Sequence, residues 1–381
     1  MLQCGMGRLR SMAFAHNQAH ARSTLRTGGL RTARHRRFRR ARPDPGAPLM
    51  DDRALLMRLS RGPATGEALA GASGQSRAAV WKRIEALREA GVGIDAKPGR
   101  GYALAQPLEL LDSDAIAAGL PPPARARAAT VEVAWTVDST NSELLRRPSA
   151  VDGAATILLA ERQTGGRGRR GREWASPLAA HVYLSVSRSF AGGLSRLGGL
   201  SLIAGIASVE ALHAAGFTGV RLKWPNDLVV RGPGGGLRKL GGLLVEGGGE
   251  HGGPVRAVIG LGLNVRMPAA FAARIDQPWC DLAGLADALP SRNALAATLL
   301  ARWLPALDEF DAAGLTPFLP RYAALDALAG QAVVVRGDHE ALAGTALGLA
   351  PDGALQVRLD DGGERSFHSG EVSVRRAGTA P

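Results

Sequence analysis

Residues 163–174 run Gln163-Thr164-Gly165-Gly166-Arg167-Gly168-Arg169-Arg170-Gly171-Arg172-Glu173-Trp174. Within Gly166–Arg172 three glycines alternate with four arginines, directly after an expected strand at Thr156–Ala160. Glycine lets a backbone approach a ligand closely, and arginine offers paired donors to phosphate and carboxylate groups. No Gly-Lys-Ser or Gly-Lys-Thr follows, so this is not a Walker loop. The well-formed sequence Trp174–Pro177 argues against a disordered arginine-glycine tract, and we expect a loop that orders around an anion.

Three further segments place polar or charged residues near the ends of expected elements. They are Asp138–Ser142, Lys223–Asp227 and Arg238–Glu246. Trp224 offers a flat face for a purine, and Asn226 or Asp227 could orient a nucleotide or ligate a metal ion through oxygen. Lys239 precedes an apolar strand and could point into a pocket. Taken singly, each segment could equally be structural, as a helix cap, a strand-end turn or an ordinary exposed lysine.

The net charge of +13 is unevenly distributed. Residues 1–49 hold 11 arginines and one acidic residue, Asp44, whereas the remainder carries 36 basic and 33 acidic side chains, a balance of +3. An arginine-rich stretch without hydrophobic periodicity cannot bury enough apolar surface to order itself. It could be a nucleic-acid arm, a targeting peptide, or upstream sequence from a wrong start codon with Met50 the true beginning. The last interpretation fits best, because a compact domain begins immediately after Met50.

Residues 50–104 predict a winged helix-turn-helix domain. The expected helices are Ala54–Leu59, a segment capped by Thr65 that ends at Ala70, and Arg77–Ala90 with Ser76 as its N-cap; the expected strands are Val92–Ala96 and Gly101–Leu104. Lys97–Arg100 is then a basic turn that serves as the wing. The third helix exposes Arg77, Lys82 and Arg83, with Trp81 beside them, as candidate DNA contacts. Exposed basic residues on a short helix can also be no more than a solvated face.

Residues 125–325 alternate short apolar runs with helical stretches, which predicts an α+β protein with a mixed sheet. The expected strands are Val131–Thr136, Thr156–Ala160, Val182–Val186, Val220–Lys223, Gly242–Val245 and Val258–Leu263, and the expected helices are Ser201–Ala214 and Leu295–Phe310. Pro305 is expected to kink the second helix. Gln106–Pro123 is expected to connect this domain to the first. Residues 330–376 alternate short strands with turn residues and predict a small β-barrel of SH3-like size.

Two cysteines, Cys4 and Cys280, lie far apart, without a Cys-x-x-Cys pair or a Cys/His cluster. This arrangement argues against a zinc site and fits a reducing cytoplasm. No stretch is long and apolar enough for a transmembrane helix, and no apolar core follows the early arginines as it would in a secretory signal. We therefore expect a cytoplasmic protein with no membrane partner and no metal held by its own side chains.

Together and in this order, these segments resemble one family. The bacterial biotin–protein ligases of the repressor-ligase type carry a Ser-Thr-Asn segment, a Gly-Arg-Gly-Arg-Arg-Gly-Arg loop, a Lys-Trp-Pro-Asn-Asp turn and a Lys-Leu-x-Gly-x-Leu-x-Glu strand. Here these are Ser139–Asn141, Gly166–Arg172, Lys223–Asp227 and Lys239–Glu246, followed by the strand Ile259–Val265. The resemblance covers residues 50–376. The arginine-rich tail and a Gly-Pro-Gly-Gly-Gly insertion within Val230–Arg238 depart from it.

The resemblance implies a class II synthetase-like central domain and a two-step reaction. Biotin and ATP form biotinyl-5′-AMP and pyrophosphate, with Mg²⁺ on the phosphates. A lysine of a biotin carboxyl carrier protein, that of acetyl-CoA carboxylase, then takes the biotinyl group. The family also implies a homodimer that, with biotinyl-adenylate bound, represses biotin-synthesis genes at operator DNA.

Roles for individual residues follow from the same resemblance. Biotin is expected to contact Ser139, Thr140, Asn141, Gln163, Arg167, Gly168, Arg169 and Lys239. Of these, Arg167, Arg169 and Lys239 are the expected catalytic residues, because they can stabilise charge on the carboxylate and phosphate. The nucleotide side is expected to include Trp224, Asn226, Asn264 and Arg375. No protein nucleophile is required, because the intermediate is a mixed anhydride.

Rival interpretations stay open. A lipoate or octanoyl ligase uses a related fold and adenylate chemistry, although the arginine-glycine loop and the winged domain argue against it. A repressor that only binds its effector would not need Arg167, Arg169 and Lys239 together. A monofunctional ligase with a vestigial DNA-binding domain is a further alternative. The operator sequence, the dimer affinity, the carrier's identity and the true N-terminus do not follow from the sequence.

Overall fold

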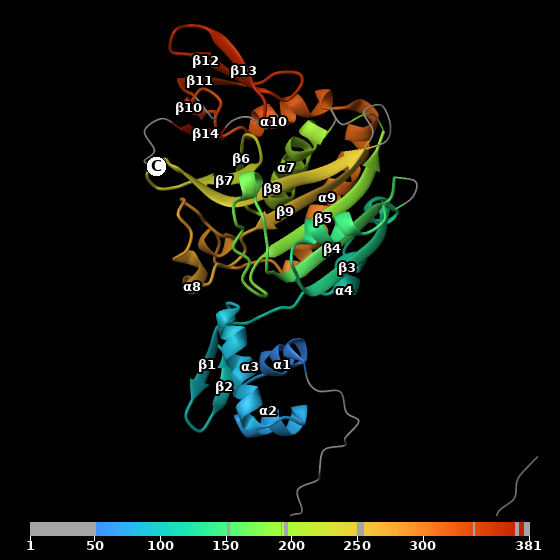
Figure 1. The fold of residues 1–381 in the computed structure, drawn as a ribbon, viewed down its shortest axis with the longest axis vertical. Coiled ribbons are helices and arrows are strands. Elements are labelled where there is room, and N and C mark those ends of the chain that lie inside the picture. Colours follow the sequence, from blue (N-terminus) through green and yellow to red (C-terminus); the bar gives the residue numbers. More distant parts are fainter. Residues whose placement is uncertain are drawn as a thin grey trace, which may run out of the picture. The chain divides into compact units, whose positions relative to one another are not determined.

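The computed structural model describes residues 51–150, 153–191, 193, 197–249, 255–337, 340–369 and 373–376. The arginine-rich segment 1–49 and Met50 lie outside the described residues. Three groups of elements follow one another along the described chain, each with a sheet of its own (Figure 1). They are a small helical domain with a hairpin, a central domain on a mixed sheet, and a C-terminal antiparallel sheet.

The first domain consists of three short helices and a two-stranded sheet. Its elements are α1 (Asp52–Ser60), α2 (Gly66–Ser73), α3 (Arg77–Glu89), β1 (Ile94–Lys97) and β2 (Gly101–Leu104). Each helix begins after a capping side chain, Asp51, Thr65 or Ser76, which accepts a hydrogen bond from a backbone N–H in the first turn. The caps predicted at Thr65 and Ser76 are therefore confirmed. β1 and β2 pair antiparallel and place the basic turn between them.

The connection to the central domain holds two short helices that the sequence analysis missed. α4 (Ser113–Ala118) begins after Asp112, whose side chain caps it. α5 (Pro122–Arg125) begins inside the proline run Pro121–Pro123. Proline is well tolerated at the first position of a helix, where its missing N–H costs nothing. A run that looks like a break in structure therefore starts a helix.

The central domain is built on a seven-stranded mixed sheet with the strand order β3-β4-β5-β9-β8-β7-β6. The strands are β3 (Ala128–Val137), β4 (Ala155–Gln163), β5 (Val182–Phe190), β6 (Arg221–Lys223), β7 (Asp227–Arg231), β8 (Leu237–Gly249) and β9 (Val255–Leu263). β3 and β4 pair parallel, and the other neighbours pair antiparallel. The predicted mixed sheet is confirmed, although β7 has no counterpart among the predicted strands.

Helices cover one face of this sheet. α7 (Leu197–Ala214) and α9 (Arg292–Ala313) pack on each other and on the strands (Figure 1), and α10 (Leu319–Leu325) packs against α7. α9 continues through Pro305 as one helix. On β9, Ile259 and Leu261 are buried in the core that these helices share. Because side chains alternate along a strand, Gly260 and Gly262 face the opposite side, which is left for a ligand.

The C-terminal domain is an antiparallel five-stranded sheet with the order β13-β12-β11-β10-β14. Its strands are β10 (Ala332–Arg336), β11 (Ala341–Leu349), β12 (Leu355–Leu359), β13 (Glu364–Phe367) and β14 (Ser373–Arg376). Val372, directly before β14, lies outside the described residues. Among the described residues no pairing joins β13 to β14, so the predicted closed barrel is not observed. The apolar face does not need closure, because Val333, Val335 and Val374 join the core of the central domain.

No helix within the described ranges is long and apolar enough to cross a lipid bilayer.

Candidate functional site

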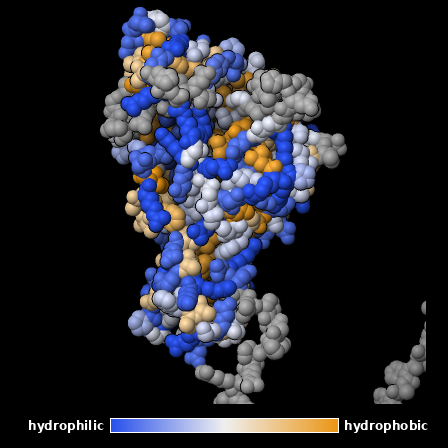
Figure 2. Space-filling model, viewed as in Figure 1, coloured by the Kyte–Doolittle hydropathy of each residue, from blue (hydrophilic) through white to orange (hydrophobic). Residues whose placement is uncertain are grey.

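A cavity of about 660 Å³ opens in the central domain, on the side of the sheet that carries Gly260 and Gly262. Most of its lining comes from the start of α6 (Thr140–Arg146), the arginine-glycine loop after β4, the turn between β6 and β7, and strands β8 and β9. The predicted site residues in its lining are Ser139, Thr140, Asn141, Gln163, Arg167, Gly168, Arg169, Trp224, Asn226 and Lys239. Figure 2 shows apolar residues exposed among hydrophilic ones on this part of the molecule. The volume is in the range of small-molecule sites.

A β-bulge on β8 aims Lys239 into this cavity. Leu228 of β7 pairs with Gly241 and Val229 pairs with Lys239, so Leu240 is an extra residue on β8. Lys239 and Gly242 are an odd number of residues apart and would face opposite sides of a regular strand. The bulge brings both into the lining while Leu240 is buried in the core. Bulges re-aim side chains beside functional sites in this way.

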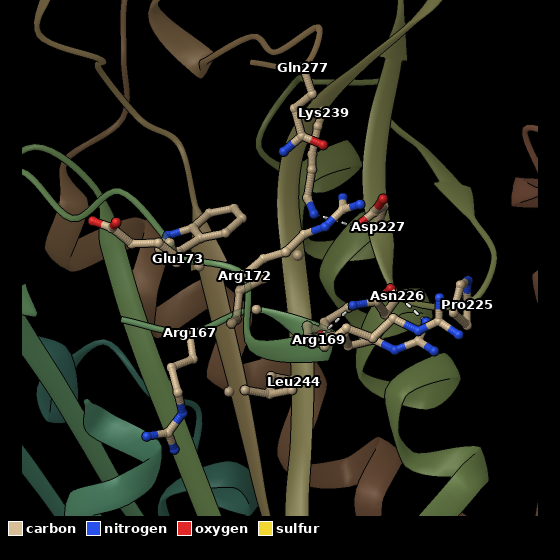
Figure 3. Close-up of a pocket in the computed structure, with 18 of the residues that line it drawn as sticks. Arg167, Arg169, Arg172, Glu173, Pro225, Asn226, Asp227, Lys239, Leu244 and Gln277 are labelled. Carbon is tan, nitrogen blue, oxygen red and sulfur yellow. Dashed lines mark hydrogen bonds and ion pairs between the residues drawn. The ribbon is translucent and has the colours of Figure 1, made fainter. Parts of the chain in front are cut away.

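Positive charge gathers at one end of the cavity around Asp227 (Figure 3). The Lys239 Nζ lies 2.6 Å from Oδ1 of Asp227, and the Lys223 Nζ lies 3.7 Å from Oδ2. Burial alone would raise the pKa of Asp227, but the charges of the two lysines and of Arg169 outweigh it and hold that pKa below its usual value. Three cations around one carboxylate leave net positive charge, which suits an anionic ligand.

Arg169 and Arg167 leave the arginine-glycine loop in different directions (Figure 3). Nη1 of Arg169 lies 3.4 Å from Oδ1 of Asn226, beside the cationic end, and burial lowers the pKa of Arg169. Arg167 points away from that end, and its guanidinium lies 3.1 Å from a carboxylate oxygen of Glu246. The two arginines therefore serve different parts of the cavity.

Backbone hydrogen bonds close the same loop, which places Trp174 against Gly242 and Gly262 of the sheet. The N–H of Gly168 donates to the carbonyl of Arg172 at 2.7 Å, and the N–H of Trp174 donates to the carbonyl of Gly166 at 2.9 Å. A Cβ on Gly262 would lie 2.4 Å from the indole of Trp174, so only glycine fits there. The buried indole N–H of Trp174 has no hydrogen-bond partner within the described part of the chain. It can donate to a ligand.

Uncharged hydrogen-bonding groups gather at the other end, where α6 begins. Ser139 caps the helix, and its Oγ accepts from the N–H of Ser142. Oε1 of Gln163 accepts from the backbone N–H and the hydroxyl of Thr140 at 2.9 and 3.1 Å. Oγ of Ser185, from β5, lies 2.7 Å from both Oγ1 of Thr140 and Oδ1 of Asn141. This continuous network suits a neutral polar ring better than a phosphate.

Three family models match successive parts of the chain. Residues 53–103 match an HTH domain, residues 134–264 match the Biotin/lipoate A/B protein ligase family, and residues 329–375 match the Biotin protein ligase C terminal domain. The chain is 39% identical over 314 residues to the bifunctional ligase/repressor BirA of Salmonella typhimurium, covering 82% of this chain and 93% of the relative. It is 38% identical over 314 residues, with the same coverage, to BirA of Escherichia coli. The chain belongs to the BirA family of bifunctional ligase/repressors.

A solved structure shares the fold of this BirA-family chain. Biotin protein ligase from Aquifex aeolicus, in complex with biotin and ATP, has a TM-score of 0.54 and 25% sequence identity. The match covers 65% of this chain and 98% of that protein. The family resemblance inferred from the arginine-glycine loop is therefore confirmed, together with the helix-turn-helix, ligase and C-terminal domains.

Three expected nucleotide contacts need comment. Trp224 touches the cavity but is only 1% exposed, and its Nε1 donates to the carbonyl of Gly353 at 3.1 Å. The expected flat face for a purine is therefore not available, because the ring joins the central domain to the C-terminal sheet. Asn264 does not line the cavity; it is buried, and its Nδ2 donates to the carbonyl of Cys280 at 3.0 Å. The side chain of Arg375, on β14, lies outside the described residues, although Val374 beside it lines the cavity.

The expected DNA contacts lie on α3. Arg77 and Lys82 are exposed, and Trp81 between them is 53% exposed. Arg83 is less accessible, because its Nε lies 3.7 Å from Oδ1 of Asp52 on α1. Of the three predicted basic contacts, Arg77 and Lys82 are the ones most open to a phosphate.

Part of the lining was missed by the sequence analysis. Arg274 and residues 276–278 contribute to the cavity from the segment after α8 (Ala269–Ala272). The N–H of Lys239 donates to the carbonyl of Pro278 at 2.9 Å, which holds this segment beside β8. It carries no periodicity or motif that would signal ligand contact.

Proposed function

We propose that the protein joins biotin to a carrier protein in two steps in the cavity of the central domain. First, an oxygen of the biotin carboxylate attacks the α-phosphorus of ATP, the bond to pyrophosphate breaks, and biotinyl-5′-AMP forms. Second, a lysine amine of a biotin carboxyl carrier protein attacks the acyl carbon, the amide forms, AMP leaves and the amine loses a proton. The observation that carries this proposal is one cavity with a cationic end and an uncharged hydrogen-bonding end.

The cationic end answers the main physical difficulty of the first step. A carboxylate and a triphosphate are both anions, so their approach must be offset by positive charge that is already in place. Lys239 and Arg169 supply that charge, and Asp227 holds Lys239 in position before the ligand arrives. Such pre-positioned charge avoids reorganisation at the moment of reaction.

The individual roles form part of the proposal. We assign the biotin ring to Ser139, Thr140, Gln163 and the indole N–H of Trp174, with Asn141 as support for this end. We assign the carboxylate and α-phosphate to Arg169, Gly168 and Lys239, and the nucleotide to Asn226 with the segment around Arg274. Arg167, Asn264, Trp224 and Arg375 remain proposed site residues by family resemblance. The contacts of the two side chains support Arg169 more directly than Arg167 for the phosphate.

Mg²⁺ is expected to accompany ATP. No group of three His, Cys, Asp or Glu side chains within the described ranges could hold a metal ion. Asp227, the carboxylate at the cationic end, is engaged by Lys239 and Lys223. These residues do not fit a site for Mg²⁺, which typically binds mainly to substrate phosphates and water. We assign no step to it.

We also propose that the protein represses biotin-synthesis genes. We propose three domains: a winged helix-turn-helix domain at residues 50–104, the catalytic domain at residues 125–325, and a C-terminal domain related to SH3-like barrels at residues 330–376. The exposed Arg77 and Lys82 on α3, and the basic turn after β1, support DNA contact. We propose a homodimer when biotinyl-adenylate is bound, because paired helix-turn-helix domains read two half-sites. We propose a cytoplasmic location, where a carrier protein and operator DNA are both present.

Transfer of labelled biotin to a purified carrier domain tests the ligase. We expect ATP-dependent label on one lysine of the carrier, and none when that lysine is replaced by arginine. Lipoate and octanoate are offered in parallel as competitors. If the carrier of a lipoate-dependent enzyme is labelled with lipoate instead, the alternative lipoate-type ligase is correct and the biotin assignment is wrong.

A gel-shift measurement tests the repressor. With biotin and ATP present, we expect the protein to shift promoter DNA of the biotin-synthesis genes and to leave a scrambled sequence of equal length unshifted. Lys82→Ala should weaken this shift more than Arg83→Ala, because Arg83 is already paired with Asp52. If no specific shift is observed, the protein is a monofunctional ligase with a vestigial DNA-binding domain.

A further inference from the structure

Glu246 lies on β8 behind the uncharged end of the cavity. Its side chain is 28% exposed, and it does not belong to the lining of the cavity. It follows Gly242 and Leu244 at intervals of two residues, so it shares the ligand-facing side of the strand with them. No part of the proposed reaction uses it so far.

The two carboxylate oxygens of Glu246 hold two different parts of the site. Oε2 accepts a hydrogen bond from Nδ2 of Asn141, on α6, at 2.9 Å. Oε1 accepts from Nη2 of Arg167, in the arginine-glycine loop, at 3.1 Å. The same Arg167 nitrogen lies 2.9 Å from Oγ of Ser142. One carboxylate therefore joins the loop to the helix on which the uncharged end is built.

Asn141 is a support and not a free ligand contact. It is 3% exposed, and the second hydrogen of its Nδ2 is directed at the carbonyl of Leu244, 3.1 Å away. Its Oδ1 lies 2.7 Å from Oγ of Ser185, and a Cβ on Gly260 would lie 2.3 Å from that oxygen. An amide group has two donor hydrogens, and both are used by the protein. We therefore assign Asn141 a supporting role, and its predicted contact with biotin stays a prediction.

We propose that Glu246 is a positioning residue for the biotin end of the site, an inference that rests on the proposed ligase function. Through Asn141 it holds Ser185, whose Oγ lies 2.7 Å from Oγ1 of Thr140 in the cavity lining, and through Arg167 it holds the arginine-glycine loop beside the same end of the cavity. A carboxylate suits this position because both of its oxygens accept. A glutamine would present its NH₂ group to either Asn141 or Arg167, where a donor is already pointing.

A purely structural role would give a different signature. Arg167 is 44% exposed, and an ion pair that is open to solvent contributes little to stability. Loss of the pair alone should therefore change the unfolding temperature little. Loss of the positioning should raise the KM for biotin. The KM for ATP should change little, because the cationic end around Asp227 is not altered.

The experiment measures biotin-dependent ATP–pyrophosphate exchange by the full chain with Glu246→Gln. We expect the KM for biotin to rise about tenfold, as for loss of a charge-assisted hydrogen bond, with kcat and the KM for ATP changed less than about twofold. Glu143→Gln is the matched control, because Glu143 lies on α6 and pairs only with Arg146 and Arg147 among the contacts described. It should behave as the unaltered chain does.

A double-mutant cycle of Glu246→Gln with Arg167→Met tests whether Glu246 acts through Arg167 or independently of it. If Glu246 acts through Arg167, the double variant should raise the KM for biotin by less than the product of the two single increases. An unchanged KM in Glu246→Gln overturns the inference. A lower kcat with higher KM values for both biotin and ATP, together with a lower unfolding temperature, also overturns it. If the unaltered chain shows no biotin-dependent exchange, the proposed ligase function itself fails, and that result is distinct from a silent Glu246 variant.

Discussion

Replacing Lys239 with alanine is expected to lower the rate of biotin-dependent ATP–pyrophosphate exchange about a hundredfold or more, the scale seen when one transition-state donor is removed. Lys239 is the cation that the β8 bulge turns into the cavity, 2.6 Å from Asp227 and 5.4 Å from the centre of the Trp174 ring. It therefore belongs to the cationic end and also lies beside Trp174. In the proposed reaction the carboxylate and the α-phosphate meet at this place.

The loss should come from charge and not from collapse of the site. Lys239→Met keeps the length of the stem over Trp174 and should be almost as inactive as the alanine variant. Lys223 remains 3.7 Å from Asp227, so the carboxylate keeps one partner and the unfolding temperature should change little. Arg302→Ala removes an exposed cation on α9, outside the cavity, and is the control for net charge. Near-normal exchange by either Lys239 variant would remove this residue from the catalytic set.

The sequence predicted which segments meet, because each carried its own local signal. The glycines and arginines of Gly166–Arg172, the turn at Lys223–Asp227 and the lysine before an apolar strand can all be read without knowledge of the fold. Helix caps are equally local, and Thr65 and Ser76 begin helices as predicted. Short-range hydrogen bonding of this kind depends on a few neighbouring residues and survives in any fold.

The direction of each side chain within the cavity was not predictable in the same way. Arg167 and Arg169 are two residues apart in one motif, yet one pairs with Glu246 and the other approaches Asn226. Trp224 belongs to the same turn as Asn226 but is buried against Gly353, 129 residues further on. Such outcomes depend on partners that are distant in sequence.

Strand register was not predictable from the sequence either. A strand pattern gives alternation, but one extra residue exchanges the two faces, and nothing in Lys239–Val245 announces the bulge at Leu240. The predicted barrel failed for a related reason. Strand patterns cannot tell whether an apolar face is covered by closure of its own sheet or by a neighbouring domain, and here Val333 and Val335 join the central core.

Arg292→Met is expected to destabilise the protein by about 3–5 kcal/mol, the cost of leaving a buried charge without its partner. Arg292 is 6% exposed on α9, and its Nη2 lies 2.9 Å from Oε2 of Glu161, which is 1% exposed. The same guanidinium donates to the carbonyls of His181 and Glu109. Glu161 also accepts from the N–H of Leu111. This ion pair therefore fastens the connection between the first two domains to the central sheet.

Urea unfolding of three variants separates the buried charge from the lost contacts. Arg302→Met makes the same change at an exposed position of the same helix and should shift stability by about 0.5 kcal/mol or less. Glu161→Gln combined with Arg292→Met removes both charges and should be more stable than Arg292→Met alone, because no ion is then left unpaired in the interior. If the double variant is instead the less stable one, the Glu161 carboxylate stabilises the fold even without Arg292, through the hydrogen bond that it accepts from the N–H of Leu111. The cost of Arg292→Met would then lie in the lost hydrogen bonds to Glu109 and His181 and not in an unpaired charge.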